Sequence, residues 1–145
     1  MKIFRHPPED IARKLLDECN LPSSDLDSAH LASFFGCGSP EELEGIIGLE
    51  VFGPVALLRS LAVVKSARGK GCAKALVSAV EKHAQENGID EMYLLTNTAE
   101  QFFMDLEYTH ADREKAPEKI KQTKEFSALC PENASFMLKK LIANQ

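Results

Sequence analysis

A short turn near the middle of the chain, within the stretch SARGKGCAKALVSAV (66–80), holds two glycines and several basic side chains. The small and apolar residues that follow are spaced for a helix that begins directly after the turn. The first N–H groups of a helix have no intrahelical partner, and the helix dipole places partial positive charge at that end. Gly69 and Gly71 lack the Cβ atoms that would keep an anion away from these amides. Arg68 and Lys70 beside them add positive charge, so the sequence predicts a turn that binds phosphate groups.

The turn lies between elements that must position it. VALLRSLAVV (55–64) is rich in aliphatic and β-branched residues and predicts a buried strand. An apolar stripe over 73–84 predicts a helix that ends at Asn87-Gly88, and MYLLT (92–96) predicts the next strand. The order strand, helix, strand makes the two strands parallel neighbours in an α/β sheet.

The remaining segments extend this order to a single α/β domain over residues 1–145, because no repeat or linker divides the chain. Ahead of the turn the sequence predicts a strand at 1–6, a helix from Pro7-Pro8 to near Asn20, a short helix capped by Ser23, Ser24 or Asp25, and strands at 32–38 and 45–53. After it come a helix at 99–106 opened by a capping box of Thr98 and Gln101, a polar strand at 108–114, one or two helical turns from Pro117 and a strand at 135–141.

Composition and charge exclude several classes of function. The chain has 145 residues, of which 44% are hydrophobic and 27% charged, as in one soluble globular domain. A net charge of -5 argues against binding nucleic acid, which needs a concentrated basic surface. No apolar run approaches the roughly 20 residues of a membrane span, and the start MKIFRHPPED lacks the apolar core of a signal peptide, so we expect a cytoplasmic protein. The cysteines lack the CxxC spacing of zinc sites, which predicts free thiols and no metal; they are Cys19, Cys37, Cys72 and Cys130.

The turn sequence also resembles a known cofactor loop. Neither GxxxxGK[ST] nor GxGxxG with a later acidic residue occurs, which excludes two common phosphate-binding loops. Arg68–Ala73 instead fits R/Q-x-x-G-x-G/A, directly after a strand that ends in Leu61-Ala62-Val63. This pattern resembles the pyrophosphate loop of the GCN5-related N-acetyltransferase (GNAT) superfamily, whose cosubstrate is acetyl-CoA. The resemblance implies a mixed, mostly antiparallel central sheet with a splayed parallel strand pair, flanked by helices.

The resemblance also implies how acetyl-CoA binds. The strand at 61–63 pairs with the pantetheine arm, and the acetyl group sits in the wedge between this strand and the strand at 92–96. An amine of the substrate attacks the thioester carbonyl directly, and a backbone N–H stabilises the oxyanion. The implied cofactor-binding residues are Leu61, Ala62, Val63, Arg68, Gly69, Lys70, Gly71, Cys72, Ala73, Asn97 and Phe103. Thr98 could also be a ligand, although helix capping alone would explain it.

The catalytic tyrosine that is frequent in this superfamily is missing. It lies in a helix resembling A-x-x-x-x-Y-x-x-x-G-F, where this chain has Phe103 and, in place of the glycine, Glu107. Phe103 has no proton to give to the departing thiolate. Tyr108 or Cys130 could substitute, but no motif supports either, so the sequence identifies no general acid and no general base.

Polar residues within the apolar strands are the candidates for binding the acceptor: Glu50, Arg59 and Ser60. Alternation along a strand predicts that Arg59 and Ser60 face opposite sides of the sheet, so at most one of them faces the acetyl group. The alternative is that Glu50 and Arg59 are strand-end or solvent-facing charges.

The C-terminal stretch IKQTKEFSALCP, together with ALLRSLAVV and AEQFFMDLEY, resembles a narrower branch, the arsenic-resistance N-acetyltransferases (ArsN2-like). Acceptor specificity in the superfamily often resides in this tail, whose candidates are Arg113, Lys121, Thr123, Phe126 and Cys130. A trivalent arsenic site needs several thiols close together, and the cysteine spacing gives no such cluster.

The resemblance therefore implies an N-acetyltransferase that moves the acetyl group of acetyl-CoA to the primary amine of a small molecule. Two alternatives stay open. Phe103 favours a non-catalytic acyl-CoA-binding or regulatory module, and a protein N-acetyltransferase is the other. We expect neither nucleic acid nor a membrane as a partner, and exposed sheet edges make a homodimer plausible.

Overall fold

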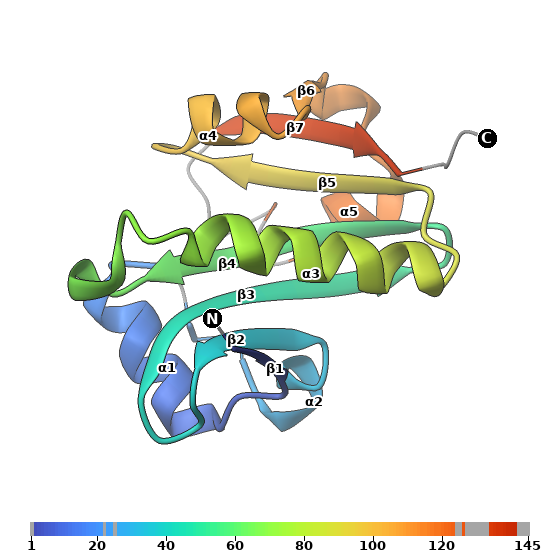
Figure 1. Cartoon of the computed structure of the whole chain (residues 1–145). Helices are drawn as coiled ribbons and strands as arrows, with labels where there is room; N and C mark the ends of the chain where they lie inside the picture. The colour runs from blue at the N-terminus through green and yellow to red at the C-terminus, as the bar shows by residue number, and fades with distance from the viewer. Residues whose placement is uncertain (1, 22, 25, 124–125, 127–133, 142–145) are drawn as a thin grey trace. The chain divides into compact units, whose positions relative to one another are not determined.

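The computed structural model describes residues 2–21, 23–24, 26–123, 126 and 134–141 (Figure 1). Its strands are β1 (Ile3–Arg5), β2 (Phe34–Gly38), β3 (Leu43–Phe52), β4 (Val55–Val63), β5 (Glu91–Thr96), β6 (Thr109–His110) and β7 (Ser135–Lys140). Its α-helices are α1 (Glu9–Glu18), α2 (Ser28–Leu31), α3 (Cys72–Glu86), α4 (Glu100–Asp105) and α5 (Glu118–Lys121), and 3-10 turns cover Lys65–Ala67 and Arg113–Lys115. No helix in this described part is long and apolar enough to cross a membrane.

The strands form a mixed sheet in the order β1-β2-β3-β4-β5-β7-β6. β4 and β5 are parallel, whereas β1–β2, β2–β3, β5–β7 and β6–β7 pair antiparallel. The parallel register joins Val55–Leu58 to Glu91–Leu94, and β4 continues beyond it to Val63. The predicted α/β class and the mostly antiparallel sheet with a parallel strand pair are confirmed.

The chain divides into two compact units, Met1–Glu50 with Arg59–His83 and Val51–Leu58 with Ala84–Gln145. In the first unit, apolar residues of α1 recur at helical spacing and are buried against α2, β2, β3 and β4. This core consists of Ala12, Leu15, Leu16, Leu26, Leu31, Phe34, Leu43, Ile46 and Ala62.

The N-terminal end of α3 packs against β3 of the same unit at a glycine. A Cβ built on Gly45 would lie 2.5 Å from Cys72 Sγ and 3.1 Å from Leu76 Cδ1. Protein interiors are already close-packed, so a side chain at this position would have to displace the helix. The absence of a side chain at Gly45 therefore sets how closely α3 approaches the sheet.

In the second unit, β5, β7 and α5 share a core of aromatic rings. The ring of Tyr93 stacks on Phe136 with 5.4 Å between the centroids, and Phe126 packs edge-on against Phe136 at 5.5 Å. Ile120 of α5 is buried in the same cluster. Burial, followed by the hydrogen bond and the charge of Glu91, raises the pKa of Tyr93 to about 12.

Most predicted elements form where the sequence places them. The helix after Pro8, the strands β2 to β5, α5 and β7 are all present. α3 ends as predicted, because Gly88 adopts a left-handed φ of +79°.

The predicted capping box of α4 is wrong. Ala99 N–H donates to Thr96 Oγ1 at 3.0 Å, and Thr98 is exposed. Gln101 donates forward to Asp105 at 2.9 Å, so its amide does not complete a box with Thr98.

The expected caps of the second helix and the polar strand also differ from the structure. Asp27 caps α2, because its carboxylate accepts a hydrogen bond from His30 N–H at 2.9 Å. Asp25 lies outside the described residues. The strand expected at 108–114 is limited to Thr109–His110, since a 3-10 turn follows it directly.

Candidate functional site

The glycine turn connects β4 to α3 and exposes its backbone. Gly69 and Gly71 have φ angles of +80° and +88°, in the left-handed region that favours glycine. A Cβ built on either residue meets no atom within 4 Å, so the space beside the turn is open. Arg68 Nε donates to Val63 O at 3.0 Å and ties the turn to the end of β4. The turn backbone is therefore held in place and accessible.

The first turn of α3 adds N–H groups to this surface. Ala75 N–H donates to Gly71 O at 3.0 Å, as the first helical hydrogen bond should. The preceding amides of Cys72, Ala73 and Lys74 therefore point out of the helix end. The dipole of this 15-residue helix favours an anion there, and the exposed basic side chains of the turn add charge. The glycine turn at 68–71 and the first amides of α3 together form a cradle that fits a diphosphate.

The end of β4 is partly built into the core. Ala62 belongs to the buried cluster of the first unit, whereas Leu61 and Val63 are half-buried. Val63 O accepts hydrogen bonds from Arg68 and, at 3.8 Å, from Cys19 Sγ. The pairing of this strand with a cofactor arm stays a prediction.

Cys72 contributes its backbone to the turn, because its side chain is turned into the core. The β2–β3 register places Cys37 opposite Gly45, and Cys72 Sγ occupies the space over that glycine. Burial, followed by the hydrogen bond and charge of the neighbouring Cys37 thiol and the charge of Glu44, raises the pKa of Cys72 to about 12. The Cys72 thiol stays protonated at neutral pH, so it is not a nucleophile beside the cradle.

A buried charge lies in the middle of β4. Arg59 has 1% of its side chain exposed, and its NH1 contacts Glu50 Oε2 at 2.6 Å. Its Nε donates to Ser60 Oγ at 3.0 Å, and its guanidinium lies 5.9 Å from the centroid of the Phe34 ring. The alternative of a solvent-facing charge is therefore wrong for Arg59. Glu50 keeps 15% of its side chain exposed and contacts Arg59 through Oε2.

Ser60 explains why strand alternation gave the wrong arrangement. Its φ is +61°, in the left-handed region, although it lies inside β4. A non-glycine residue held there costs about 1–3 kcal/mol, and such strain clusters at functional sites. The irregularity brings the hydroxyl of Ser60 to the guanidinium of Arg59, which the expected opposite faces would not allow.

The predicted site residues of the second unit differ in exposure. Asn97 is exposed directly after β5, where a ligand can reach it. Phe103 is buried and packs edge-on against Phe102 and Tyr108, with centroids 5.1 and 5.5 Å away. Tyr108 is itself buried beneath Lys139, and Cys130 lies outside the described residues. Phe103 has no proton to give, and Tyr108 beside it is buried.

The tail candidates gather around a helical turn and an aromatic ring. Lys121 Nζ donates to Glu114 O at 2.7 Å, and Thr123 is buried with its hydroxyl on Ile120 O at 2.7 Å. The guanidinium of Arg113 lies 4.9 Å from the centroid of the Phe126 ring. Arg113 and Phe126 are therefore in contact, whereas Thr123 has a local structural role.

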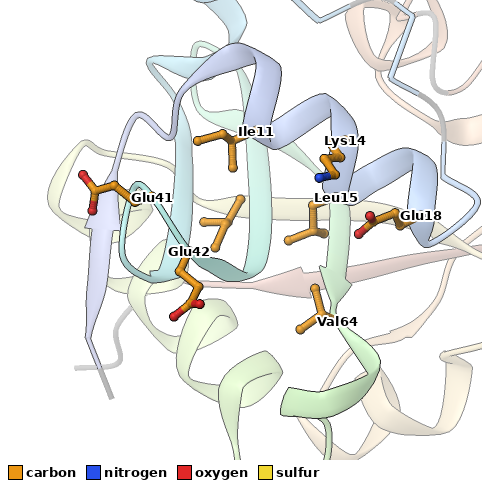
Figure 2. A pocket seen from close by; sticks show the side chains of 8 residues that line it. Ile11, Lys14, Leu15, Glu18, Glu41, Glu42 and Val64 are labelled. Carbon is orange, nitrogen blue, oxygen red and sulfur yellow. The ribbon is translucent and has the colours of Figure 1, made fainter.

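A pocket of about 220 Å³ beside α1 was not predicted from the sequence. Its walls come from α1, the β2–β3 connection, the start of β3 and the residue after β4, and they consist of Ile11, Lys14, Leu15, Glu18, Glu41, Glu42, Leu43 and Val64 (Figure 2). Three carboxylates on its rim would repel phosphate, so this pocket is separate in chemistry from the glycine turn. No pattern in the sequence relates these distant segments, because only the fold brings them together.

A metal site is not evident in the described part of the chain. No group of three or more His, Cys, Asp or Glu residues there could hold a metal ion. The contact between Cys37 and Cys72 involves two thiols only.

A sequence model of the acetyltransferase (GNAT) family matches residues 3–108. The chain belongs to this family. The matched span includes the glycine turn and all of β4, α3, β5 and α4, so the GNAT assignment covers every residue predicted to bind the cofactor.

Individual relatives agree with the GNAT fold. An uncharacterized N-acetyltransferase, CT2212, from Chlorobaculum tepidum is 30% identical over 92 residues, which are 63% of this chain and 59% of that protein. N-acetylglutamate synthase from Neisseria gonorrhoeae, complexed with coenzyme A and N-acetyl-glutamate, is similar with a TM-score of 0.82 at 19% identity. The alignment covers 98% of this chain but only 35% of the synthase. Rv2747 from Mycobacterium tuberculosis, in complex with CoA and NLQ, gives a TM-score of 0.78 at 18% identity, over 98% of this chain and all of that one.

Proposed function

We propose that this GNAT protein transfers the acetyl group of acetyl-CoA to the primary amine of a small molecule. The observation that carries the proposal is the glycine turn, in which two left-handed glycines and the first amides of α3 face open space. Membership of the GNAT family supports the same cosubstrate.

Each part of the chain has a distinct task in this proposal. Acetyl-CoA, when bound, supplies an activated acetyl thioester. The amides from Gly69 to Lys74 hold its diphosphate, with Arg68 and Lys70 as counter-charges. The backbone of Leu61–Val63 orients the arm that carries the thioester. Asn97, exposed after β5, is a further ligand of the cosubstrate.

On the acceptor side, Glu50 is suited to bind an ammonium group. Arg59 contacts Oε2 of this carboxylate, which stays partly exposed and can accept a hydrogen bond from the amine. The ammonium must first lose a proton to solvent water, and the nitrogen loses a second proton to water as the C–N bond forms and the C–S bond of the thioester breaks. Since Phe103 offers no proton, the departing thiolate leaves as the anion, which a thiol of ordinary acidity tolerates near neutral pH.

A small acceptor is favoured over a protein. The similar N-acetylglutamate synthase structure contains N-acetyl-glutamate, a small product. The resemblance of the tail to arsenic-resistance N-acetyltransferases adds arsenical amino compounds to the acceptors that deserve assay. We place the reaction in the cytoplasm, on a single domain, with a homodimer as the plausible assembly.

One observation favours a second function. Phe103 is buried in the aromatic core at the position where the superfamily often has its tyrosine. A non-catalytic module that binds acyl-CoA and regulates a partner would keep the cradle and need no proton donor.

Calorimetric titration with acetyl-CoA, followed by a thiol-release screen over amino acids, polyamines, aminoglycosides and arsenical amino compounds, distinguishes the two functions. Binding with thiol release on an amine establishes the transferase. Binding without release on any amine supports the module instead.

The Gly71→Glu variant tests the cradle itself. A carboxylate among amides that bind a diphosphate should weaken acetyl-CoA binding at least tenfold, by charge repulsion and by filling the open space. Gly88→Glu is the matched control, since Gly88 lies at the other end of α3 with a similar φ of +79° and open surroundings. Both variants should lose a similar amount of thermal stability. Unchanged affinity in Gly71→Glu would remove the basis of the cofactor assignment.

A further inference from the structure

Arg113 is held in a fixed orientation without using most of its hydrogen-bonding capacity. Its guanidinium stacks over Phe126 at 4.9 Å from the ring centroid, and NH1 donates to Ala134 O at 3.0 Å. A guanidinium carries five N–H donors in a planar fork. The stacking and the carbonyl fix the plane of the fork and leave an edge of it for another acceptor.

No acidic side chain of the described residues neutralises this arginine. The ion pairs within the described ranges do not include Arg113, although it is half-buried. The adjacent Asp112 carboxylate accepts a hydrogen bond from Glu114 N–H at 2.9 Å. A half-buried guanidinium with a fixed plane and no carboxylate partner in the described part of the chain is suited to bind an anion.

The position of Arg113 places this anion site at the carboxyl end of β5. Its anchor, Ala134, directly precedes Ser135, which pairs with Thr96 at the last position of β5. Ala111 N–H donates to Phe136 O at 2.9 Å, which brings the chain before Arg113 to the same end of β7. Ligands of open α/β sheets bind outside the carboxyl ends of parallel strands, and Arg113 lies at that end of the parallel strand β5.

We infer that Arg113 binds a carboxylate of the acceptor, so that the acceptor is an amino acid or another amine that carries a carboxylate. This inference rests on the proposed acetyl transfer. Arg113 is thus a substrate-binding and specificity-determining residue that lies outside the glycine turn and β4.

The charge around Arg113 selects a carboxylate over a phosphate dianion. A single guanidinium balances one negative charge and pairs with a carboxylate through two parallel hydrogen bonds. Asp112 and Glu114 flank it in the chain, and the protein as a whole carries a net charge of -5. A second negative charge on the ligand would meet repulsion from these acids. Lys121, the other basic candidate of the tail in the described residues, donates to the carbonyl of Glu114.

The test compares each L-amino acid that supports thiol release with its carboxamide, in which the carboxylate is replaced by a neutral group of equal size. The wild type should bind the acid more tightly, with a KM lower by roughly ten- to hundredfold, as expected for charged hydrogen bonds. Arg113→Gln should raise the KM of the acid by a similar factor, change kcat less, and leave the KM of the amide and the affinity for acetyl-CoA unchanged. Arg113→Lys should restore part of the preference, because it keeps the charge and loses the fork.

Lys115→Gln is the matched control, since Lys115 is an exposed basic residue of the same 3-10 turn as Arg113 and its removal does not touch the stacked ring. It should keep the acid-over-amide preference. Equal KM values for acid and amide in the wild type, or equal losses for both in Arg113→Gln, would overturn the inference and leave acetyl transfer standing.

A binding measurement without turnover separates the two possible failures. The Arg113 Nε–H resonance of the wild-type protein, followed by NMR with saturating CoA, should shift on addition of the free amino acid and not of its amide. A shift of the same size with both, or with neither, would overturn the carboxylate site. A shift specific for the acid in a protein that fails to bind acetyl-CoA by calorimetry would keep the site and reject the proposed function.

Discussion

At the scale of single residues, the side chain of Arg59 depends most on its neighbours, because it is both charged and buried. It is the buried charge among the described residues, and burial of a charge costs several kcal/mol unless a partner and hydrogen bonds compensate it. Glu50 supplies the opposite charge and Ser60 a hydroxyl. The sequence identified all three residues as polar positions in apolar strands. It could not predict their contact, because the left-handed φ of Ser60 is a response to tertiary structure rather than to residue type.

Removing the carboxylate that pairs with Arg59 should lower the stability of the fold. We expect Glu50→Ala to lower the free energy of unfolding by about 3 kcal/mol, at the low end for a broken buried pair because Glu50 is partly exposed. Urea denaturation measures the change. Glu44→Ala is the control, since Glu44 is an exposed acid on the same strand and should cost little. Equal losses in the two variants would mean that the pair contributes nothing beyond an ordinary surface charge.

At the scale of elements, regular spacing of apolar residues predicted helices and strands correctly, whereas the capping motif expected from local sequence did not form. α3 and β5 formed as expected because their apolar faces decide where they pack. The capping box of α4 failed because Thr96, at the end of the strand, reaches the Ala99 amide first. The glycine turn was predictable because it lies between a clear strand pattern and a clear helix pattern. The pocket beside α1 was not, since its walls come from segments with no shared pattern.

The contact between α3 and β3 gives a test of helix packing. Gly45→Ala should destabilise the protein by about 1–3 kcal/mol, because its Cβ would lie 2.5 Å from Cys72 Sγ. Cys72→Ala removes that sulfur, so the double variant should be more stable than the sum of the single changes predicts, by at least about 0.5 kcal/mol. A complete double-mutant cycle in urea measures the coupling. Strict additivity would show that Leu76 and the backbone of Ala62, rather than Cys72, limit the space.

At the scale of the whole molecule, the sheet order and family membership agree with the fold expected from the sequence. The single domain, the homodimer and the acceptor stay predictions, because they depend on surfaces and ligands rather than on periodicity. The fold nevertheless raises the pKa of an acid in the described part of each compact unit, Cys72 in the first and Tyr93 in the second.

These two acids predict how stability depends on alkaline pH. Their pKa values rise from 9.0 and 10.0 to about 12 on folding, so the unfolded chain releases these protons first. Their contribution to stability is therefore complete below pH 9 and is lost as pH rises toward 12. Cys72→Ala should make the fall in the free energy of unfolding shallower from pH 9, and Tyr93→Phe from pH 10. Denaturation curves across this pH range test the prediction. If the free energy of unfolding of both variants depended on pH as in the wild type, the prediction would be refuted.

The cradle at the start of α3 is made of main-chain amides and the absence of two side chains. A site of this kind is inherited as a backbone conformation, and the identity of most neighbouring side chains is free to drift without loss of the cosubstrate. Chains that share only 19% of their residues with this one can thus share its fold with a TM-score of 0.82. Diversification of a common donor reaction toward new acceptors would then need changes only in side chains outside these main-chain amides.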